Sequence, residues 1–165
     1  MTMRFDRPWP GDDWASAVRA LARETDARIV TLAQVARDAP RAVRLADALG
    51  GEYLAPPSMR HDDLDAHTRS VYQRSLAVVS DRAHGLIIGA TEGAYPMGSG
   101  SDPQKISRLL AAVGLDGLVG HYDQFAEFAA RFADHRPSLG PAVLAARARI
   151  AELTSRIHAV IDDVA

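Results

Sequence analysis

The stretch GLIIGATEGAYPMGSGSD, residues 85–102, holds five glycines and decides how the chain on either side of it is interpreted. Glycine frees the backbone to turn, and a glycine-rich stretch of this length is typical of a loop. Residues 85–89 are too apolar for a solvated loop, so we expect a short buried extended segment near residues 86–90. The last residues, with Pro103, have the pattern of a helix cap. The sequence therefore predicts a glycine-rich loop that leads into a helix.

The segments on both sides of this loop have the spacing of amphipathic helices. In three of them apolar residues recur every three or four positions, as they do along one face of a helix. These segments are residues 12–25, 62–82 and 103–113. A β-branched patch at residues 29–30 also permits a strand. We expect an all-α fold, a bundle of six or seven helices, in a single helical domain over residues 1–165 that begins with an arm at residues 1–11.

The most regular pattern lies in residues 139–163, which we expect to form the last helix. Apolar residues there are spaced alternately four and three positions apart, the heptad pattern of a helix that packs along one narrow seam. The pattern leaves open whether the seam packs inside the monomer or against a second copy of the chain. Its members are Leu139, Val143, Ala146, Ile150, Leu153, Ile157, Val160 and Val164.

The composition excludes several kinds of site. The chain has no cysteine, so disulfides, thiolate nucleophiles and cysteine-based zinc or iron–sulfur sites are excluded. A formal net charge of −2 gives no general attraction to nucleic acid or to an anionic membrane. The first residues lack the apolar core of a secretion signal, and no apolar run approaches the length of a membrane span. We therefore expect a cytoplasmic protein that binds neither nucleic acid nor membranes.

The glycines of the loop do not complete a nucleotide-binding motif. Gly93 and Gly98 have the spacing of a Walker loop, but the lysine that meets the terminal phosphates is missing. Gly98 and Gly100 would begin a dinucleotide-binding fingerprint, but its third glycine position is Pro103 and no parallel βαβ pattern surrounds it. No two histidines are spaced one helical turn apart, and no glutamate is followed three positions later by a histidine, as in metal-binding helices. The sequence predicts neither a cofactor nor a metal site.

A set of polar side chains in and near the loop could nevertheless form a small pocket. A carboxylate and an imidazole exchange protons near neutral pH, so Glu92 with His67 or His84 is the candidate catalytic group. Hydroxyl groups, an arginine and a helix amino terminus can hold a small anion. The candidate ligand-binding residues are Arg60, Thr91, Tyr95, Ser99 and Ser101.

Two functions of different classes remain open. The first, which we favour, is a non-catalytic helical binding protein that forms a homodimer, or binds a protein partner, through its C-terminal helix. Its basis is the regular heptad pattern together with the absence of a complete catalytic motif. The second is a small helical enzyme or small-molecule binder. In this alternative residues 89–102 close a pocket in which Glu92 and a histidine meet a small anionic ligand.

Overall fold

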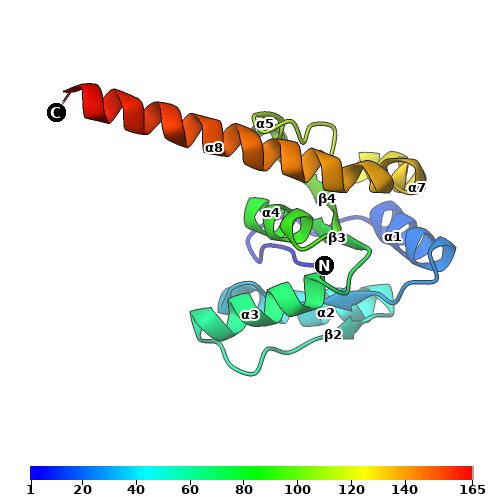
Figure 1. The fold of residues 1–165 in the computed structure, drawn as a ribbon. Coiled ribbons are helices and arrows are strands. Elements are labelled where there is room, and N and C mark those ends of the chain that lie inside the picture. Colours follow the sequence, from blue (N-terminus) through cyan, green and yellow to red (C-terminus); the bar gives the residue numbers. More distant parts are fainter. Residues whose placement is uncertain (165) are drawn as a thin grey trace.

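The fold is a mixed α/β structure in which helices surround parallel strands (Figure 1). The computed structural model describes the backbone of residues 1–164 and the side chains of residues 1–161. One sheet has two parallel strands in the order β1-β2, and the other has three in the order β3-β4-β5. The strands are β1 (Val30–Thr31), β2 (Glu52–Tyr53), β3 (Ala77–Ser80), β4 (Tyr95–Gly100) and β5 (Val119–His121).

Residues 1–3 join the two sheets. The Met1 carbonyl accepts a hydrogen bond from the Leu32 N–H, and the Thr2 N–H donates to the Val79 carbonyl. Thr2 also pairs in parallel with Ser80. The extended segments therefore run in the order β2-β1-(1–3)-β3-β4-β5. Numbered along the chain, this order is 3-2-1-4-5-6, which is that of a doubly wound sheet and reverses between residues 1–3 and β3.

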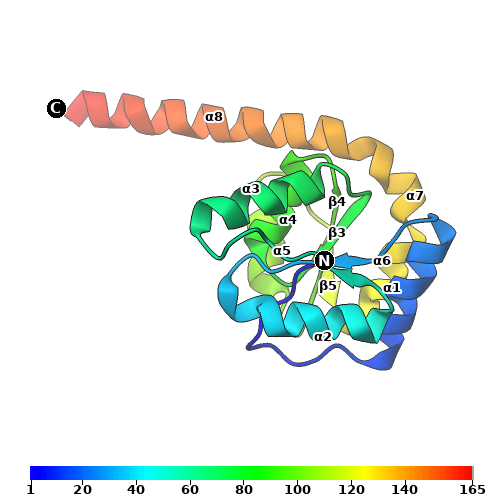
Figure 2. The same cartoon turned by 90° about the horizontal axis from the view of Figure 1, so that it is seen from below.

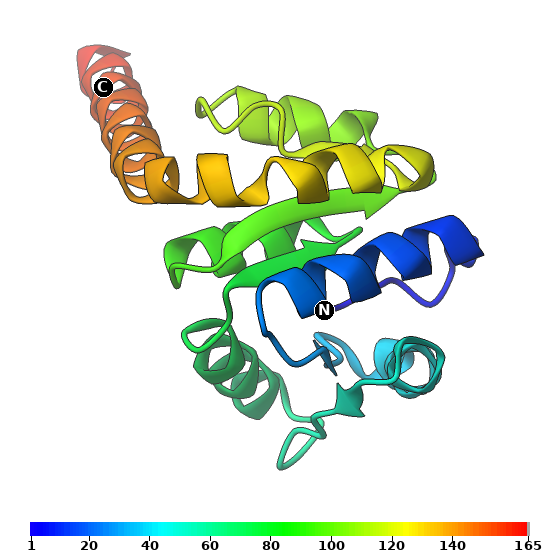
Figure 3. The same cartoon turned by 90° about the vertical axis from the view of Figure 1, so that its right-hand side faces the viewer.

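Helices cover both faces of this sheet (Figures 2 and 3). On one face lie α1 (Asp12–Glu24), α2 (Ala39–Leu49) and α6 (Phe125–Ala130). On the other face lie α3 (His61–Tyr72), α4 (Ala83–Thr91) and α5 (Gln104–Ala111). The remaining helical elements are η1 (Ala36–Asp38), η2 (Tyr122–Gln124), α7 (Phe132–His135), η3 (Arg136–Ser138) and α8 (Leu139–Val164). Because both faces are covered, the strands have apolar neighbours above and below them.

The predicted all-α helical bundle is wrong, because the chain forms parallel strands that the helical spacing concealed. The predicted helix over residues 62–82 divides into α3, which ends at Tyr72, and β3. A strand that is covered on both faces lacks the alternation of apolar and polar residues, and three of the four residues of β3 are buried. The apolar run AVVS could therefore be taken for one more helical turn.

The predicted loop over residues 85–102 is also wrong. Its first residues belong to α4, where an extended segment was expected near residues 86–90, and its second half is β4, all of whose residues are buried. Gly98 is required in this strand because a Cβ atom there would lie 2.7 Å from Val119 Cγ2 and 2.9 Å from Leu86 Cδ1. Glycine is needed at this position because neighbouring elements pack closely there, and not because the backbone must turn as in a loop.

The helix α8 lies where the heptad pattern predicts a helix, and it extends well beyond the rest of the molecule (Figures 1 and 2). Leu139 and Ala146, near its start, are buried, whereas the later members of the seam are exposed. The side chain of Val164, the last predicted member, lies outside the described residues. Among the helices that the structure describes, α8 included, none has the combination of length and apolar character that crossing a membrane requires.

Candidate functional site

The carboxyl ends of the central strands meet at the point where the strand order reverses. Doubly wound sheets bind their ligands in the crevice at this edge. Here the strand of residues 1–3 leads into Arg4, β3 leads into Asp81, and Gln34 follows β1. Arg41, on α2, reaches the same region. We call Thr2, Gln34, Arg41 and Asp81 the carboxyl-edge site.

Asp81 is a buried carboxylate with one unpaired oxygen. The residue is 7% exposed. Its Oδ1 accepts a hydrogen bond of 2.7 Å from the N–H of Arg4, whereas Oδ2 has no partner in the described part of the chain. Burial raises the pKa of the Asp81 carboxyl above its ordinary value, against the opposing effects of the Arg4 N–H and of the Arg41 and Arg82 guanidinium groups. A buried carboxylate with a raised pKa is typical of functional sites.

Three further buried polar atoms of this site have no partner among the described residues. They are Thr2 Oγ1, Gln34 Oε1 and Arg41 Nε. Buried polar atoms without a partner are rare in folded proteins, and seven occur in the described chain, of which four belong to this one site. The other three are the hydroxyl groups of Tyr53, Thr68 and Tyr72. Unsatisfied hydrogen-bonding capacity is therefore concentrated at the carboxyl edge.

The first turn of α4 packs directly on these strands. A Cβ atom at Gly85 would lie 2.7 Å from Ser80 Oγ, 3.1 Å from Thr2 Cγ2 and 3.2 Å from Gln34 Oε1. Only glycine fits this contact without a shift of its neighbours. The amino terminus of α4, with its unpaired N–H groups, is thereby held at the strand-order reversal.

A buried ion pair fixes the same helix end. Asp38 is fully buried, and its carboxylate accepts hydrogen bonds from Arg82 Nε at 2.6 Å and from Arg82 Nη2 at 2.8 Å. The N–H of Phe5 donates to the same carboxylate at 3.1 Å. Such a two-point pair has a defined geometry. Asp38 and Arg82 therefore support the site, while their own hydrogen-bonding groups are engaged with each other.

Of the predicted arm over residues 1–11, residues 1–3 form a strand, and residues 4–10, which we call the arm from here on, cover the carboxyl-edge site. Arg41 donates from Nη1 to the Arg7 carbonyl at 2.8 Å and from Nη2 to the Pro8 carbonyl at 2.7 Å. The guanidinium groups of Arg41 and Arg44 lie 5.2 Å and 4.3 Å from the ring centroid of Trp9.

Beneath the arm, Asp81 faces a cavity of about 10 Å³. This volume holds one water molecule. The other residues that line it are Arg7, Ser99, Gly100, Ser101, Asp102, Pro103, Ile106 and Val119.

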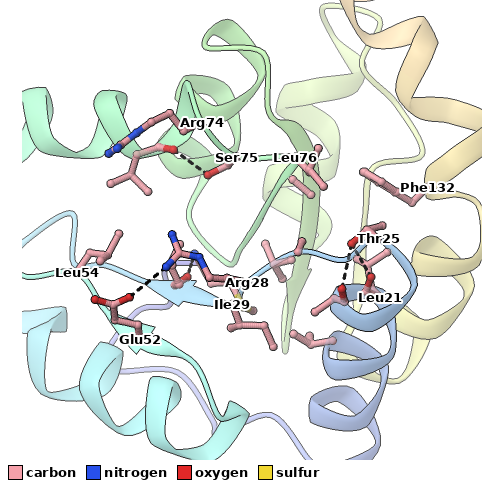
Figure 4. Close-up of a pocket in the computed structure, with 18 residues that line it drawn as sticks. Leu21, Thr25, Arg28, Ile29, Glu52, Leu54, Arg74, Ser75, Leu76 and Phe132 are labelled. Carbon is pink, nitrogen blue, oxygen red and sulfur yellow. Dashed lines mark hydrogen bonds and ion pairs between the residues drawn. The ribbon is translucent and has the colours of Figure 1, made fainter.

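A much larger groove lies at the opposite edge, beside the amino ends of β1 and β3 (Figure 4). Its volume of about 520 Å³ falls in the range of small-molecule pockets. Its apolar lining includes Leu21, Ile29, Leu76 and Phe132. We call it the amino-edge groove.

The polar side chains of this groove are either exposed or already bonded. Thr25 Oγ1 donates to the Leu21 carbonyl at 2.7 Å, and Ser75 Oγ donates to the Val71 carbonyl at 2.8 Å. The pair Arg28–Glu52, 4.0 Å apart, has side chains that are 88% and 63% exposed. The groove has the size of a ligand site but no buried polar side-chain atom without a partner among the described residues that line it.

The structure does not bring the predicted catalytic residues together. Glu92 follows the carboxyl end of α4, where hydrogen bonds from Gln73 and Arg69 lower the pKa of its carboxyl. His67 lies on α3 with Nε2 3.1 Å from the Leu54 carbonyl oxygen. His84 is exposed on the first turn of α4, at the other end of that helix from Glu92.

The predicted ligand-binding residues divide between several regions. Arg60 is exposed before α3, and Thr91 is exposed at the end of α4. Tyr95 is buried at the start of β4 against Phe132, with ring centroids 5.5 Å apart, and burial raises the pKa of its hydroxyl.

Ser99 and Ser101 are the two predicted residues that line the cavity beside Asp81. Ser99 accepts a hydrogen bond of 3.1 Å from Trp14 Nε1.

Sequence reasoning missed the carboxyl-edge site itself. Thr2, Gln34, Arg41 and Asp81 are far apart in the sequence and come together only through the parallel sheet. One signal was present: two valines are followed directly by Ser80 and Asp81, as expected where a buried strand ends at a polar edge. In the predicted all-α fold that aspartate lies on a helix instead.

The described residues contain no group of three or more histidine, aspartate and glutamate side chains placed to hold a metal ion. Comparisons of the chain with models of protein families, with curated proteins and with solved structures give no match. The strand order is shared by proteins of many activities, so the fold alone assigns none. The basis for a function is therefore the chemistry of the carboxyl-edge site.

Proposed function

We propose that this protein binds a small anionic molecule that carries hydroxyl groups, of the class that includes nucleoside monophosphates and sugar phosphates, at the carboxyl-edge site. The observation that supports this most is the unpaired Oδ2 of Asp81, a buried carboxylate oxygen at the strand-order reversal. A buried acceptor without a partner costs about 1–3 kcal/mol of stability. Proteins keep such costs mainly where function requires the group.

We infer that the ligand carries hydroxyl groups because the site has hydrogen-bond acceptors that lack a donor. An ionised carboxylate can only accept hydrogen bonds, and so can the amide oxygen of Gln34. Asp81 Oδ2 and Gln34 Oε1 both lack a donor within the described chain. A molecule with hydroxyl groups supplies donors to both, as ribose does to the acidic residue of dinucleotide-binding sheets.

The anionic group of the ligand follows from the surrounding charge. Arg4 pairs with Asp6, and Arg82 pairs with Asp38, whereas neither Arg7 nor Arg41 forms an ion pair within 4.0 Å in the described structure. The nine-residue helix α4 also begins at this site. The partial positive charge of its amino terminus favours an anion there.

Access to the site requires the arm of residues 4–10 to move, because the cavity beneath it holds no more than a water molecule. The arm is held by hydrogen bonds from the Arg4 and Phe5 N–H groups to Asp81 and Asp38, by hydrogen bonds from Arg41 to two carbonyl groups, and by the stacking of Trp9. Phe5 and Trp9 are 48% and 36% exposed, so little apolar packing opposes this motion. Trp9 is therefore a natural fluorescent reporter of ligand binding.

The proposal is tested by thermal unfolding with a panel of probes: adenosine 5′-monophosphate, ribose 5-phosphate, glucose 6-phosphate and inorganic phosphate. A ligand at one hundred times its dissociation constant adds about 2.7 kcal/mol to the stability of the folded state. At least one hydroxylated probe is expected to raise the melting temperature of the wild type, and phosphate alone is expected to do so less.

Asp81→Asn is expected to abolish this stabilisation, because an asparagine amide group turned towards the ligand is a donor where an acceptor is required. Glu52→Gln, which removes an exposed carboxylate beside the amino-edge groove, is the matched control and should respond as the wild type does. A wild type that no probe stabilises, or an Asp81→Asn variant that is stabilised equally, contradicts the proposal.

A further inference from the structure

The C-terminal half of α8 carries an apolar stripe that the rest of the described chain does not cover. Its members, Ile150, Leu153, Ile157 and Val160, are 51%, 53%, 58% and 65% exposed. Figures 1 and 2 show this part of the helix running out beyond the body of the molecule. Exposed apolar residues in such a row mark an interaction surface.

The stripe continues the heptad seam, whose first half packs against the body of the same chain. Upstream on the same heptad positions, Leu139 and Ala146 are buried, and Ala146 packs with Leu86, Leu110 and Leu115 of the body. The first half of the seam therefore binds the chain's own core. The second half has the same spacing and the same kind of side chains, so a helix is the partner that fits it.

We propose that the stripe of one chain pairs with the stripe of a second copy in an antiparallel, two-fold symmetric coiled coil. If Ile150 faces Val160 of the second copy, then Leu153 faces Ile157, and the same two contacts recur on the other side of the axis. Each of these layers joins two apolar side chains. A surface that complements itself in this way forms a closed dimer.

The body of each chain excludes the parallel arrangement. The seam up to Ala146 faces the chain's own body, so a parallel second helix would place its residues 139–149 in the space that this body fills. In the antiparallel arrangement the two bodies lie at opposite ends of the paired helices. The stripe then pairs along its full length without a clash.

The charges at the two ends of the stripe favour the same orientation. The sequence has Arg147 and Arg149 just before the stripe and Asp162 and Asp163 just after it. An antiparallel pair brings the basic start of one stripe to the acidic end of the other, whereas a parallel pair would bring like charges together. This dimer is independent of ligand binding at the carboxyl edge, and its test does not involve a ligand.

The first experiment measures the mass of the full-length chain by sedimentation equilibrium between 1 and 200 μM. We expect the wild type to rise from 17.8 kDa towards twice that mass as the concentration increases. The double variant Leu153→Glu, Ile157→Glu should raise the dissociation constant at least 100-fold. Both side chains are exposed in the single chain, so its circular dichroism should match that of the wild type.

The matched control is Leu144→Glu. Leu144 is 67% exposed on the same helix but lies off the seam, so this variant should dimerise as the wild type does. A wild type that stays at 17.8 kDa throughout the range overturns the proposal. Equal loss of the dimer in the Leu144→Glu variant also overturns it, because the contact would then not be the seam.

A second experiment tests the orientation, using the absence of native cysteine. In the antiparallel dimer residue 150 of one chain lies beside residue 160 of the other, and the two copies of residue 150 are about 15 Å apart along the axis. The variant Ile150→Cys, Val160→Cys should form an intermolecular disulfide, whereas Ile150→Cys alone should not. Efficient cross-linking of Ile150→Cys alone would overturn the antiparallel arrangement.

Discussion

The two edges of the parallel sheet carry very different sites: one has a large volume and few unpaired polar groups, and the other has a small volume and many. The amino-edge groove has a volume of about 520 Å³, but its polar side chains are exposed or already bonded. At the carboxyl edge the cavity beside Asp81 has room for one water molecule, yet the four buried polar atoms of the carboxyl-edge site lack partners in the described chain. Of these two sites, the groove has by far the larger volume. Because unpaired buried groups cost stability, the polar chemistry is the stronger indication of function.

The largest contrast between the edges is expected for their ion pairs. Asp38→Asn at the carboxyl edge leaves the guanidinium group of Arg82 without its buried partner, which should lower the free energy of unfolding by about 3–5 kcal/mol. Glu52→Gln at the amino edge breaks an exposed pair and should change it by less than about 0.5 kcal/mol. Urea denaturation of both variants measures these values. Equal effects would show that the ion pair at the carboxyl edge contributes no more to stability than the ion pair at the amino edge.

A smaller effect is expected where α4 meets the carboxyl edge. Gly85→Ala adds a Cβ atom 2.7 Å from Ser80 Oγ, so the helix or the strand must shift, at a cost of about 1–3 kcal/mol. Gly140→Ala is the control, since no atom lies within 4 Å of the added Cβ atom and the residue is part of α8. The control should be neutral or stabilising by up to about 1 kcal/mol. A neutral Gly85→Ala variant in urea denaturation would contradict the close packing.

The smallest effect concerns the pH dependence that Asp81 contributes. Its pKa is raised in the folded state, so the folded protein binds this proton more tightly than the unfolded chain does. The contribution of Asp81 to stability therefore falls as the pH rises from the unfolded pKa, about 4, through the folded pKa. Asp81→Asn lacks this loss. Its free energy of unfolding relative to that of the wild type should therefore increase as the pH rises from 4 to 7.

Chemical denaturation of both proteins at intervals between pH 4 and pH 7 measures this difference. The result to look for is the change of the difference with pH, since other titrating groups contribute equally to the two proteins. A difference that stays constant or decreases would show that Asp81 is not buried without a partner. If Asp81→Asn both loses ligand binding and gains stability relative to the wild type as the pH rises, then Asp81 lowers the stability of the protein and is needed for its function.

The positions of several helices could be predicted from the sequence, but the fold class could not. The predicted segments 12–25, 103–113 and 139–163 lie close to α1, α5 and α8. Helices carry a local signal in the spacing of their apolar residues. The strand β4 carries no comparable signal, because Pro96 and Gly98 are residues that strands disfavour. It forms a strand because it lies between β3 and β5 and packs closely against both, and the local sequence does not reveal these neighbours.

The same reason explains why only a part of the candidate site could be predicted. Ser99 and Ser101 are predictable because their hydroxyl groups lie beside a helix start, which is local information, and both line the cavity beside Asp81. Asp81 lies beside them, and Gln34 lies at the same edge of the sheet, only because β1 and β3 lie on either side of residues 1–3. A prediction that contained the parallel sheet would have placed both residues at its carboxyl edge.

The most direct test of the central claim is to locate the bound ligand by amide chemical-shift mapping of the ¹⁵N-labelled chain of 17.8 kDa. The wild type is titrated with the hydroxylated anionic probe that stabilises it most in thermal unfolding. The predicted result is a concentration-dependent shift at Arg4, Asp81 and Ser101. Shifts confined to Ile29 and Leu76, beside the amino-edge groove, would contradict the account.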